Sequence, residues 1–209
     1  ASWVLTPRVP QADSFFDVFV EDANALFVLG ASGDGAVLFR SLDGGLTWDN
    51  PGGAVPAGSR SLAVLGPQRL AVGGRNGLFV SRDGGQTFEP AAPALPTNRV
   101  IPFEGLDAIP GSGEAFAVGA GGVILWTRDA GDSWMPFTER ALTGADLSDF
   151  SAARYLSYPE GPYVPSPNGS RVLVATDDGA LLESADGGAT FEPVASPTGA
   201  ALRTIATPL

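Results

Sequence analysis

The sequence contains no cysteine and no histidine, and its basic residues are all arginine because lysine is absent as well. Without cysteine or histidine the chain cannot build a zinc finger, an iron–sulfur centre, a thiol nucleophile, a Ser-His-Asp triad or a disulfide. A cation site made of carboxylates is the metal centre that these absences leave open. We expect neither a cofactor nor a bound metal.

Positive charge is also scarce. There are 23 acidic residues against 12 basic ones, which gives a formal net charge of −11 at pH 7. A surface this acidic repels phosphate backbones, so we expect no nucleic-acid partner. No apolar run reaches the roughly 18 residues that a bilayer-spanning helix needs, so we expect no membrane insertion. With 44% hydrophobic and 17% charged residues, the chain has the material for a packed core.

Sustained helical periodicity is missing too, whereas 28 glycines and 18 prolines in 209 residues favour short strands and tight turns over a helical bundle. The chain begins at Ala1 and its single methionine is Met135. We therefore expect either a mature form that has lost a leader or a part cut from a longer protein. We also expect an extracytoplasmic location, either periplasmic or secreted.

An eight-residue motif occurs four times, at 41–48, 81–88, 127–134 and 184–191. Its pattern is Ser or Thr, any residue, Asp, Gly or Ala, Gly, any residue, Thr or Ser, and Trp or Phe. The residues that define it are Ser41, Asp43, Gly45, Thr47 and Trp48; Ser81, Asp83, Gly85, Thr87 and Phe88; Thr127, Asp129, Gly131, Ser133 and Trp134; and Ser184, Asp186, Gly188, Thr190 and Phe191. Self-similarity at this period indicates a repeat architecture.

Two short apolar runs, separated by a turn rich in Gly, Asp or Asn, precede each motif. Such runs are typical of strands, and their continuous apolar character indicates burial on both faces. The paired runs are 26–30 with 37–39, 70–73 with 78–80, 116–119 with 123–126, and 172–176 with 181–182. Opening strands are expected at 16–20, 61–65 and 106–109. Four strands per repeat predict the blade of a β-propeller.

The motif resembles the Asp-box, or bacterial neuraminidase repeat, of sialidases, xyloglucanases, sortilin-like receptors and the photosystem II stability/assembly factor, the last being most similar. This resemblance implies an all-β propeller with four complete four-stranded antiparallel blades and partial blade strands at both termini. Residues 2–7 are similar to the end of a box, and residues 202–207 to an opening strand. Residues 1–209 are therefore either a single propeller domain with a makeshift last blade or a segment of a larger propeller.

We interpret all four boxes as structural turns. The Asp side chain is expected to accept backbone N–H bonds, the glycines to supply positive φ, and the aromatic residue to be buried. The alternative is that each box carboxylate binds calcium or takes part in catalysis. In the resembled family these turns lie away from the ligand-binding face.

No residue is assigned as catalytic. By resemblance, a sialidase needs three arginines around a substrate carboxylate, and arginines near opening strands are Arg60, Arg99 and Arg203, but no Arg-Ile-Pro motif precedes the first box. A xyloglucanase-type hydrolase needs two carboxylates that face each other across a cleft. Candidates at or near opening strands are Asp17, Glu104, Asp107, Asp146 and Asp149. If the protein is an enzyme, we expect a glycoside hydrolase.

The segment between the third and fourth boxes is the longest, and we expect an extended loop at about 143–169. It holds every tyrosine of the chain, Tyr155, Tyr158 and Tyr163, with Arg154 beside them. Long loops often carry function, and tyrosine is enriched in interfaces. We therefore predict a partner-binding surface from this loop together with Arg60, Arg99 and Arg203. The alternative is a surface excursion whose tyrosines pack onto their own blade.

These observations favour a bacterial, non-catalytic propeller scaffold that binds a protein or peptide, similar to the photosystem II stability/assembly factor. The alternative is a carbohydrate-active propeller: a sialidase-like or xyloglucanase-like glycoside hydrolase, or a sugar-binding module. A pair of facing carboxylates beside an exposed aromatic residue in the channel would favour the hydrolase. An arginine-lined face without such a pair would favour the binding protein.

Overall fold

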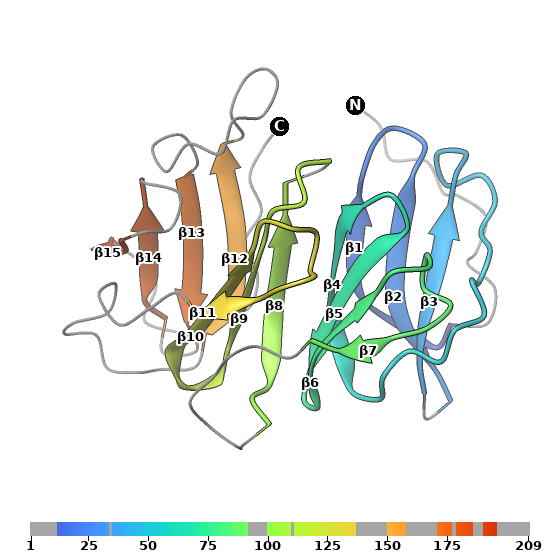
Figure 1. Ribbon diagram of the computed structural model, residues 1–209, viewed down its shortest axis with the longest axis horizontal. Helices are drawn as coiled ribbons and strands as arrows, with labels where there is room; N and C mark the ends of the chain where they lie inside the picture. The colour runs from blue at the N-terminus through green and yellow to red at the C-terminus, as the bar shows by residue number, and fades with distance from the viewer. Residues whose placement is uncertain are drawn as a thin grey trace.

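A computed structural model describes residues 12–33, 35–91, 100–109, 111–136, 150–157, 171–176, 179–185 and 190–195. These residues form β-strands arranged in four antiparallel sheets (Figure 1). In each sheet, strands that follow one another in the sequence are neighbours. Every sheet is therefore an up-and-down meander, as expected for a propeller blade.

The first sheet contains β1 (Ser14–Val20), β2 (Leu26–Ser32) and β3 (Gly35–Ser41). The second contains β4 (Ser59–Gly66), β5 (Arg69–Gly74), β6 (Gly77–Ser81) and β7 (Glu89–Pro90). The third contains β8 (Phe103–Ala108), β9 (Ala115–Gly119), β10 (Val123–Thr127) and β11 (Met135–Pro136), with a short 3₁₀ turn, η1 (Ala120–Gly122), between β9 and β10. The fourth contains β12 (Phe150–Ser157), β13 (Arg171–Thr176), β14 (Leu181–Ser184) and β15 (Glu192–Val194).

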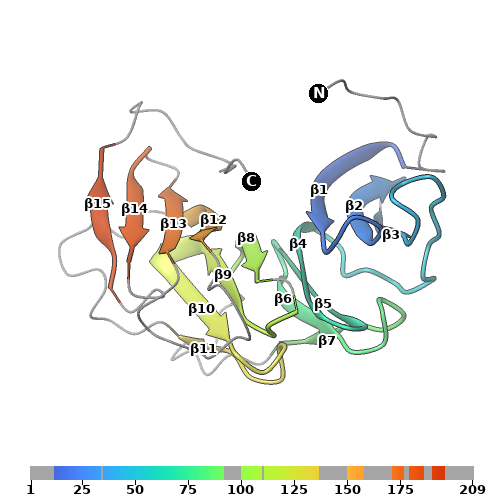
Figure 2. The same cartoon turned by 90° about the horizontal axis from the view of Figure 1, so that it is seen from above.

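The first strands of the four sheets, β1, β4, β8 and β12, pack against one another in that order. The remaining strands of each sheet fan outward from them (Figure 2). This is the arrangement of propeller blades around an axis, with the first strand of each blade innermost. The predicted all-β propeller class is confirmed.

The core lies between the blades. One apolar cluster joins the first three blades and includes Leu29, Leu38, Leu65 and Leu125, all 1% exposed or less. A second cluster, which includes Val118, joins the third and fourth blades. Strands β5 and β9 are buried along nearly their whole length, which is why their sequences are apolar without alternation.

The first blade lacks a regular fourth strand within the described residues. After the first box, the chain makes a single antiparallel bridge, between Arg40 and Asp49, and then leaves the sheet. The Oδ1 atom of Asn50 accepts a hydrogen bond from the N–H of Gly52 at 2.7 Å, which bends the chain. Pro51 has no N–H with which to continue the ladder. The predicted complete first blade is therefore reduced to three strands and a bridge.

The extended loop predicted at about 143–169 is wrong in its middle portion, because residues 150–157 form the innermost strand β12. Strand β12 is rich in alanine and serine, and its pairing with β13 keeps it in the sheet. Several predicted residues lie outside the described residues: Arg99, Arg203, Tyr158, Tyr163, Asp146, Asp149, Asp186 and Gly188, together with both terminal segments. In the part of the chain that the structure describes, no helix is long and apolar enough to cross a membrane.

Candidate functional site

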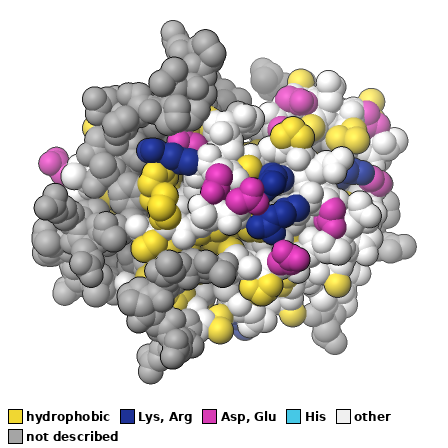
Figure 3. Space-filling model, in the orientation of Figure 1, with side chains coloured by type: hydrophobic (Ala, Val, Ile, Leu, Met, Phe, Trp, Pro, Cys, Tyr) yellow, Lys and Arg dark blue, Asp and Glu magenta, His cyan; other side chains and the backbone are white. Residues whose placement is uncertain are grey.

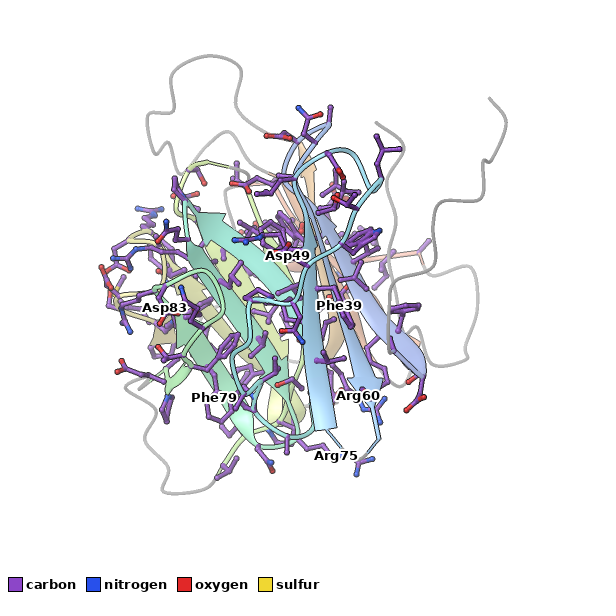
Figure 4. All side chains as sticks on the ribbon, turned by 90° about the vertical axis from the view of Figure 1, so that its right-hand side faces the viewer. Phe39, Asp49, Arg60, Arg75, Phe79 and Asp83 are labelled. Carbon is purple, nitrogen blue, oxygen red and sulfur yellow. The ribbon has the colours of Figure 1, made fainter. Side chains whose placement is uncertain are left out.

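The loops of the propeller fall at two ends. The box end carries the Asp-boxes and the turns between the first and second strands of each blade. The opposite end carries the turns between the second and third strands and the starts of the innermost strands. In Figure 4, Arg60 and Arg75 lie close together at the opposite end, while Asp49 and Asp83 lie toward the box end.

The first box forms a closed hydrogen-bonded turn. One oxygen of Asp43, Oδ1, accepts hydrogen bonds from the N–H of Thr47 and the hydroxyl of Ser41, both at 2.8 Å. The other oxygen, Oδ2, accepts a bond from the Thr47 hydroxyl at 2.6 Å. The buried Ser41 Oγ in turn accepts a bond from the N–H of Gly45 at 2.8 Å. Both carboxylate oxygens are therefore used within the turn itself.

The second and third boxes repeat these bonds. Asp83 and Asp129 each accept from the backbone N–H and the hydroxyl four residues later, and from the hydroxyl two residues before. The glycine at the fifth position of each of these boxes, Gly85 or Gly131, donates its N–H to that earlier hydroxyl. Among the described residues, no cluster of three or more acidic side chains could hold a metal ion.

Backbone conformation explains the two small residues in the middle of each box. Gly84 and Gly85 have φ of 73° and 92°, in the left-handed region that glycine adopts without strain. The third box places Ala130 at the first of these positions with φ of 54°. In all three described boxes this residue donates its N–H to a carbonyl in the turn between the first and second strands: Gly44 to Asn24, Gly84 to Gln68, and Ala130 to Gly113.

These hydrogen bonds also shift the acidity of the box carboxylates. Hydrogen bonds from the Thr47 hydroxyl and N–H lower the pKa of Asp43 to about 2, and those from Thr87 do the same for Asp83. For Asp129, partial burial raises the pKa, but the bonds from Ser133 outweigh it and the pKa is lowered. The carboxylates are therefore ionised acceptors over the whole neutral range, which does not suit a general acid.

Each arginine at the box end whose side chain the structure describes is ion-paired. Arg40 contacts Asp49 at 2.8 Å, and the buried Glu114 contacts Arg128 at 3.2 Å. Asp132, in the third blade, is held by two arginines of the second blade, Arg69 at 2.7 Å and Arg82 at 3.0 Å. The hydrogen bond from Arg69, followed by that from Arg82, lowers the pKa of Asp132. The two contacts of Asp132 therefore join the second and third blades.

The opposite end differs. Arg60 and Arg75 are exposed, and neither forms an ion pair, whereas every other arginine whose side chain the structure describes forms one. The guanidinium of Arg60 lies over the ring of Phe16, 4.6 Å from its centroid. The backbone N–H of Arg75 donates to the carbonyl of Gly58 at 3.2 Å, so the turn that carries Arg75 is fixed beside the start of β4.

The carboxylates predicted near the innermost strands have different roles. Asp17 accepts hydrogen bonds from the N–H groups of Val18 and Leu62, at 2.9 and 2.8 Å, so it joins the first two blades. Asp107 is buried, with 2% of its surface exposed. Glu104 is exposed at the start of β8. Among these three described acids, only Glu104 faces solvent freely.

The structure thus brings one predicted partner-binding residue, Arg60, into an open position at the opposite end. It places Arg154 and Tyr155 on the innermost strand β12 rather than in a loop. Two residues of this end were not singled out for binding in the sequence. Phe16 lies under Arg60, and Arg75 follows the glycines that end β5. The sequence signal that could have indicated Arg75 is its charge in a turn between two apolar runs.

No known protein-family pattern matches the chain, and no curated protein matches its sequence. Solved structures do match. An ancestral GH74 enzyme is 18% identical with a TM-score of 0.62, covering 95% of this chain and 26% of the enzyme. YCF48 from Cyanidioschyzon merolae is 16% identical with a TM-score of 0.60, covering 96% of this chain and 62% of YCF48.

YCF48 bound to a D1 peptide is 18% identical to this chain, with a TM-score of 0.57, and the match covers 88% of this chain and 55% of that one. The chain spans less than two thirds of the length of each of these proteins. Identities this low support the propeller fold and leave the function open.

Proposed function

We propose that this protein is a non-catalytic scaffold that binds a protein or peptide at the end opposite the Asp-boxes. The observation that carries the proposal is the contrast between the two ends. The described arginines at the box end are neutralised by carboxylates of the protein itself, whereas Arg60 and Arg75 are exposed without such a partner in the described part of the chain. An unpaired guanidinium is a two-pronged donor suited to the carboxylate of a ligand.

The two arginines are also held in position. The Phe16 ring supports the guanidinium of Arg60 from below. The side-chain amide of Asn76 donates to the carbonyl of Ala57 at 2.9 Å and so fixes the turn of Arg75 to the segment before β4. A preorganised donor loses less conformational entropy when its ligand binds.

Structural similarity supports this proposal at the level of the fold. YCF48, a similar propeller, has been solved with a bound D1 peptide. A propeller of this kind can therefore present a peptide-binding surface. The finer proposal is a bacterial assembly- or stability-factor-like role outside the cytoplasm, and it rests on the resemblance of the repeats.

The rival function is a carbohydrate-active propeller, since GH74 enzymes share the fold. A hydrolase needs two carboxylates that reach one sugar. Of the acids described near the innermost strands, Asp17 is engaged with backbone N–H groups and Asp107 is buried. The described part of the opposite end therefore favours binding through arginine over hydrolysis.

The test is selection from a random twelve-residue peptide library against the protein, followed by titration of the resynthesised peptides. Selected peptides should carry carboxylates, and their affinity should fall about tenfold or more in an Arg60→Ala/Arg75→Ala variant. Arg40→Ala is the matched control, because Arg40 is an ion-paired arginine at the box end. It should bind like the parent protein.

Three outcomes would contradict the proposal. The library could give no specific peptide, the double variant could bind as well as the parent, or Arg40→Ala could be the variant that loses binding. Binding and cleavage of xyloglucan or sialyl oligosaccharides, in place of peptide binding, would support the carbohydrate-active alternative.

A further inference from the structure

The innermost strand of each blade contains a β-bulge at the same level, near the end opposite the Asp-boxes. The pairing with the second strand shifts by one residue between Phe15 and Asp17, Ser59 and Ser61, Phe103 and Gly105, and Phe150 and Ala152. The residue skipped in each blade, called here the bulge residue, is Phe16, Arg60, Glu104 or Ser151. Bulges re-aim side chains and are common beside functional sites.

In each of the first three blades, a glycine of the second strand lies opposite the start of the bulge. Gly74 and Gly119 end the second strands β5 and β9, and Gly30 lies two residues before the end of β2. Each of these glycines pairs with the residue just before the bulge. A Cβ atom at any of these glycines would overlap a carbonyl oxygen of the innermost strand or of the segment leading into it, that of Ser14, Gly58 or Pro102. Glycine is therefore required there by close backbone approach. The bulge residue, the paired glycine and the close carbonyl oxygen therefore recur in three blades that differ in sequence.

Contacts between adjacent blades join the bulges of the first three blades. Arg60 contacts the ring of Phe16 directly. Ser61, the residue after one bulge residue, donates its hydroxyl to the carbonyl of Phe103, the residue before the next, at 3.4 Å. Arg60 and Glu104 therefore flank a single contact between adjacent blades.

Side chains at these equivalent positions differ in chemistry. Phe16 is aromatic, Arg60 is a cation and Glu104 is an anion. The last two are exposed and unpaired among the described residues, although they sit in neighbouring blades. The backbone geometry is shared and does not dictate the side chain, so the side chains are available for recognition.

We propose that the bulge residues form one recognition site for a peptide segment that carries an acidic and a basic residue close together. Arg60 receives the carboxylate, Glu104 receives the Lys or Arg of the segment, and the Phe16 ring contacts its apolar part. This inference rests on the proposed peptide-binding function and names its ligand class. Because packed sheets lie about 10 Å apart and an extended peptide advances about 3.3 Å per residue, the two charges of the ligand should be two to four residues apart.

A purely acidic ligand fits this site less well. The protein has a net charge of −11, which repels a polyanion. Glu104 lies at the equivalent position of the blade next to that of Arg60, and it would repel a second carboxylate of the ligand. A segment with balanced charge satisfies both side chains and avoids the long-range repulsion.

The experiment uses the tightest-binding peptide from the library selection and two variants of it. In the first variant, Asp is replaced by Asn or Glu by Gln; in the second, Lys or Arg is replaced by Gln. Each peptide is titrated against the parent protein, Arg60→Gln, Glu104→Gln and the control Glu192→Gln, an exposed acid on the outer strand β15. Thermal unfolding of each variant verifies that the fold is intact.

We expect a loss of about five- to tenfold for Arg60→Gln and for Glu104→Gln. The peptide that lacks its basic residue should bind Glu104→Gln with the same affinity as the parent protein. Likewise, the peptide that lacks its acidic residue should bind Arg60→Gln with the same affinity as the parent protein. A Glu104→Lys variant should regain affinity for a peptide whose basic residue is changed to Glu. Glu192→Gln should bind like the parent.

Two results would overturn the inference and leave the proposed function standing. The selected peptides could lack the acid–base pair, or Glu104→Gln could bind every peptide like the parent while Arg60→Gln loses affinity. If the Arg60→Ala/Arg75→Ala variant also binds like the parent, the proposed function itself fails.

Discussion

At the scale of single residues, the first hydroxyl of each box is the most constrained polar atom of the turn. Ser81 has none of its surface exposed, donates to Asp83 and accepts the N–H of Gly85 at 2.8 Å. The third box places Thr127 in the same role, with the same partners. The position therefore requires a hydroxyl and accepts an extra methyl group.

Ser81→Ala should lower the free energy of unfolding by about 1–3 kcal/mol, because the buried N–H of Gly85 loses its acceptor. Ser81→Thr is the matched control and should stay close to the parent. Urea unfolding followed by tryptophan fluorescence measures both. If Ala and Thr at this position gave equal stability, the hydroxyl would not hold the turn.

The box carboxylates should also determine stability in acid. The pKa values of Asp43 and Asp83 are about 2 in the folded protein, below the usual 3.8. A carboxylate with a lowered pKa in the fold stabilises it above its unfolded pKa, and this stabilisation is lost as pH falls through the folded pKa. The melting temperature should therefore drop between about pH 4 and pH 2.

An Asp43→Asn/Asp83→Asn variant lacks these two titrating groups. It should melt lower than the parent at neutral pH and show a shallower decline from pH 4 to pH 2. Melting curves across that range provide the measurement. Parallel declines for parent and variant would mean that the two boxes do not contribute to the acid dependence.

At the scale of secondary-structure elements, a glycine near the end of the second strand faces the bulge of the innermost strand in the first three blades. Gly119 has an extended backbone, with φ of −159°, so any residue could adopt its conformation. Its restriction is purely steric, because a Cβ would overlap the carbonyl oxygen of Pro102. Gly121, two residues later, has the reverse restriction: φ is 70°, and no described atom lies within 4 Å of a Cβ built there.

This contrast predicts a large effect for one substitution and a small one for the other. Gly119→Ala should cost about 3 kcal/mol, because two backbone segments must separate. Gly121→Ala should cost about 1 kcal/mol, the strain of a left-handed alanine. Chemical denaturation of the two variants compares them, and an equal or reversed order would show that the bulge is not held by close approach.

Most strands could be predicted from the sequence because their apolar runs are bounded by turn residues and followed by a box. Strand β12 could not, because its alanines, serines and Arg154 give no apolar run, and pairing with β13 keeps it extended. The reduced fourth strand of the first blade depends on Asn50 and Pro51, a local turn signal that the repeat pattern obscured.

The candidate site was less predictable because the state of an arginine depends on distant residues. Arg82 is paired with Asp132, which lies 50 positions away in the sequence. The sequence indicates Arg60 by its position near an opening strand, but it does not distinguish Arg75 from other charged turn residues. Glycines near the ends of the second strands are the sequence signal for the bulges of the first three blades, whereas the fourth blade has Thr176 at this position.

At the scale of the whole molecule, the propeller has two chemically different ends. The box end is fastened by turns whose carboxylates, hydroxyls and arginines satisfy one another. In Figure 3, arginine and acidic side chains accordingly lie side by side on the visible face. The opposite end presents bulged side chains, with Arg60 and Arg75 exposed and unpaired in the described part. We propose that the box end supports the structure and that the opposite end recognises the ligand.

Hydrogen–deuterium exchange of the protein with and without the selected peptide tests this separation most directly. The account predicts that peptide binding slows exchange at the starts of β4 and β8 and in the turn at residues 74–77, and leaves the boxes at 41–48, 81–88 and 127–134 unchanged. Slower exchange confined to the boxes, with none at the opposite end, would contradict it.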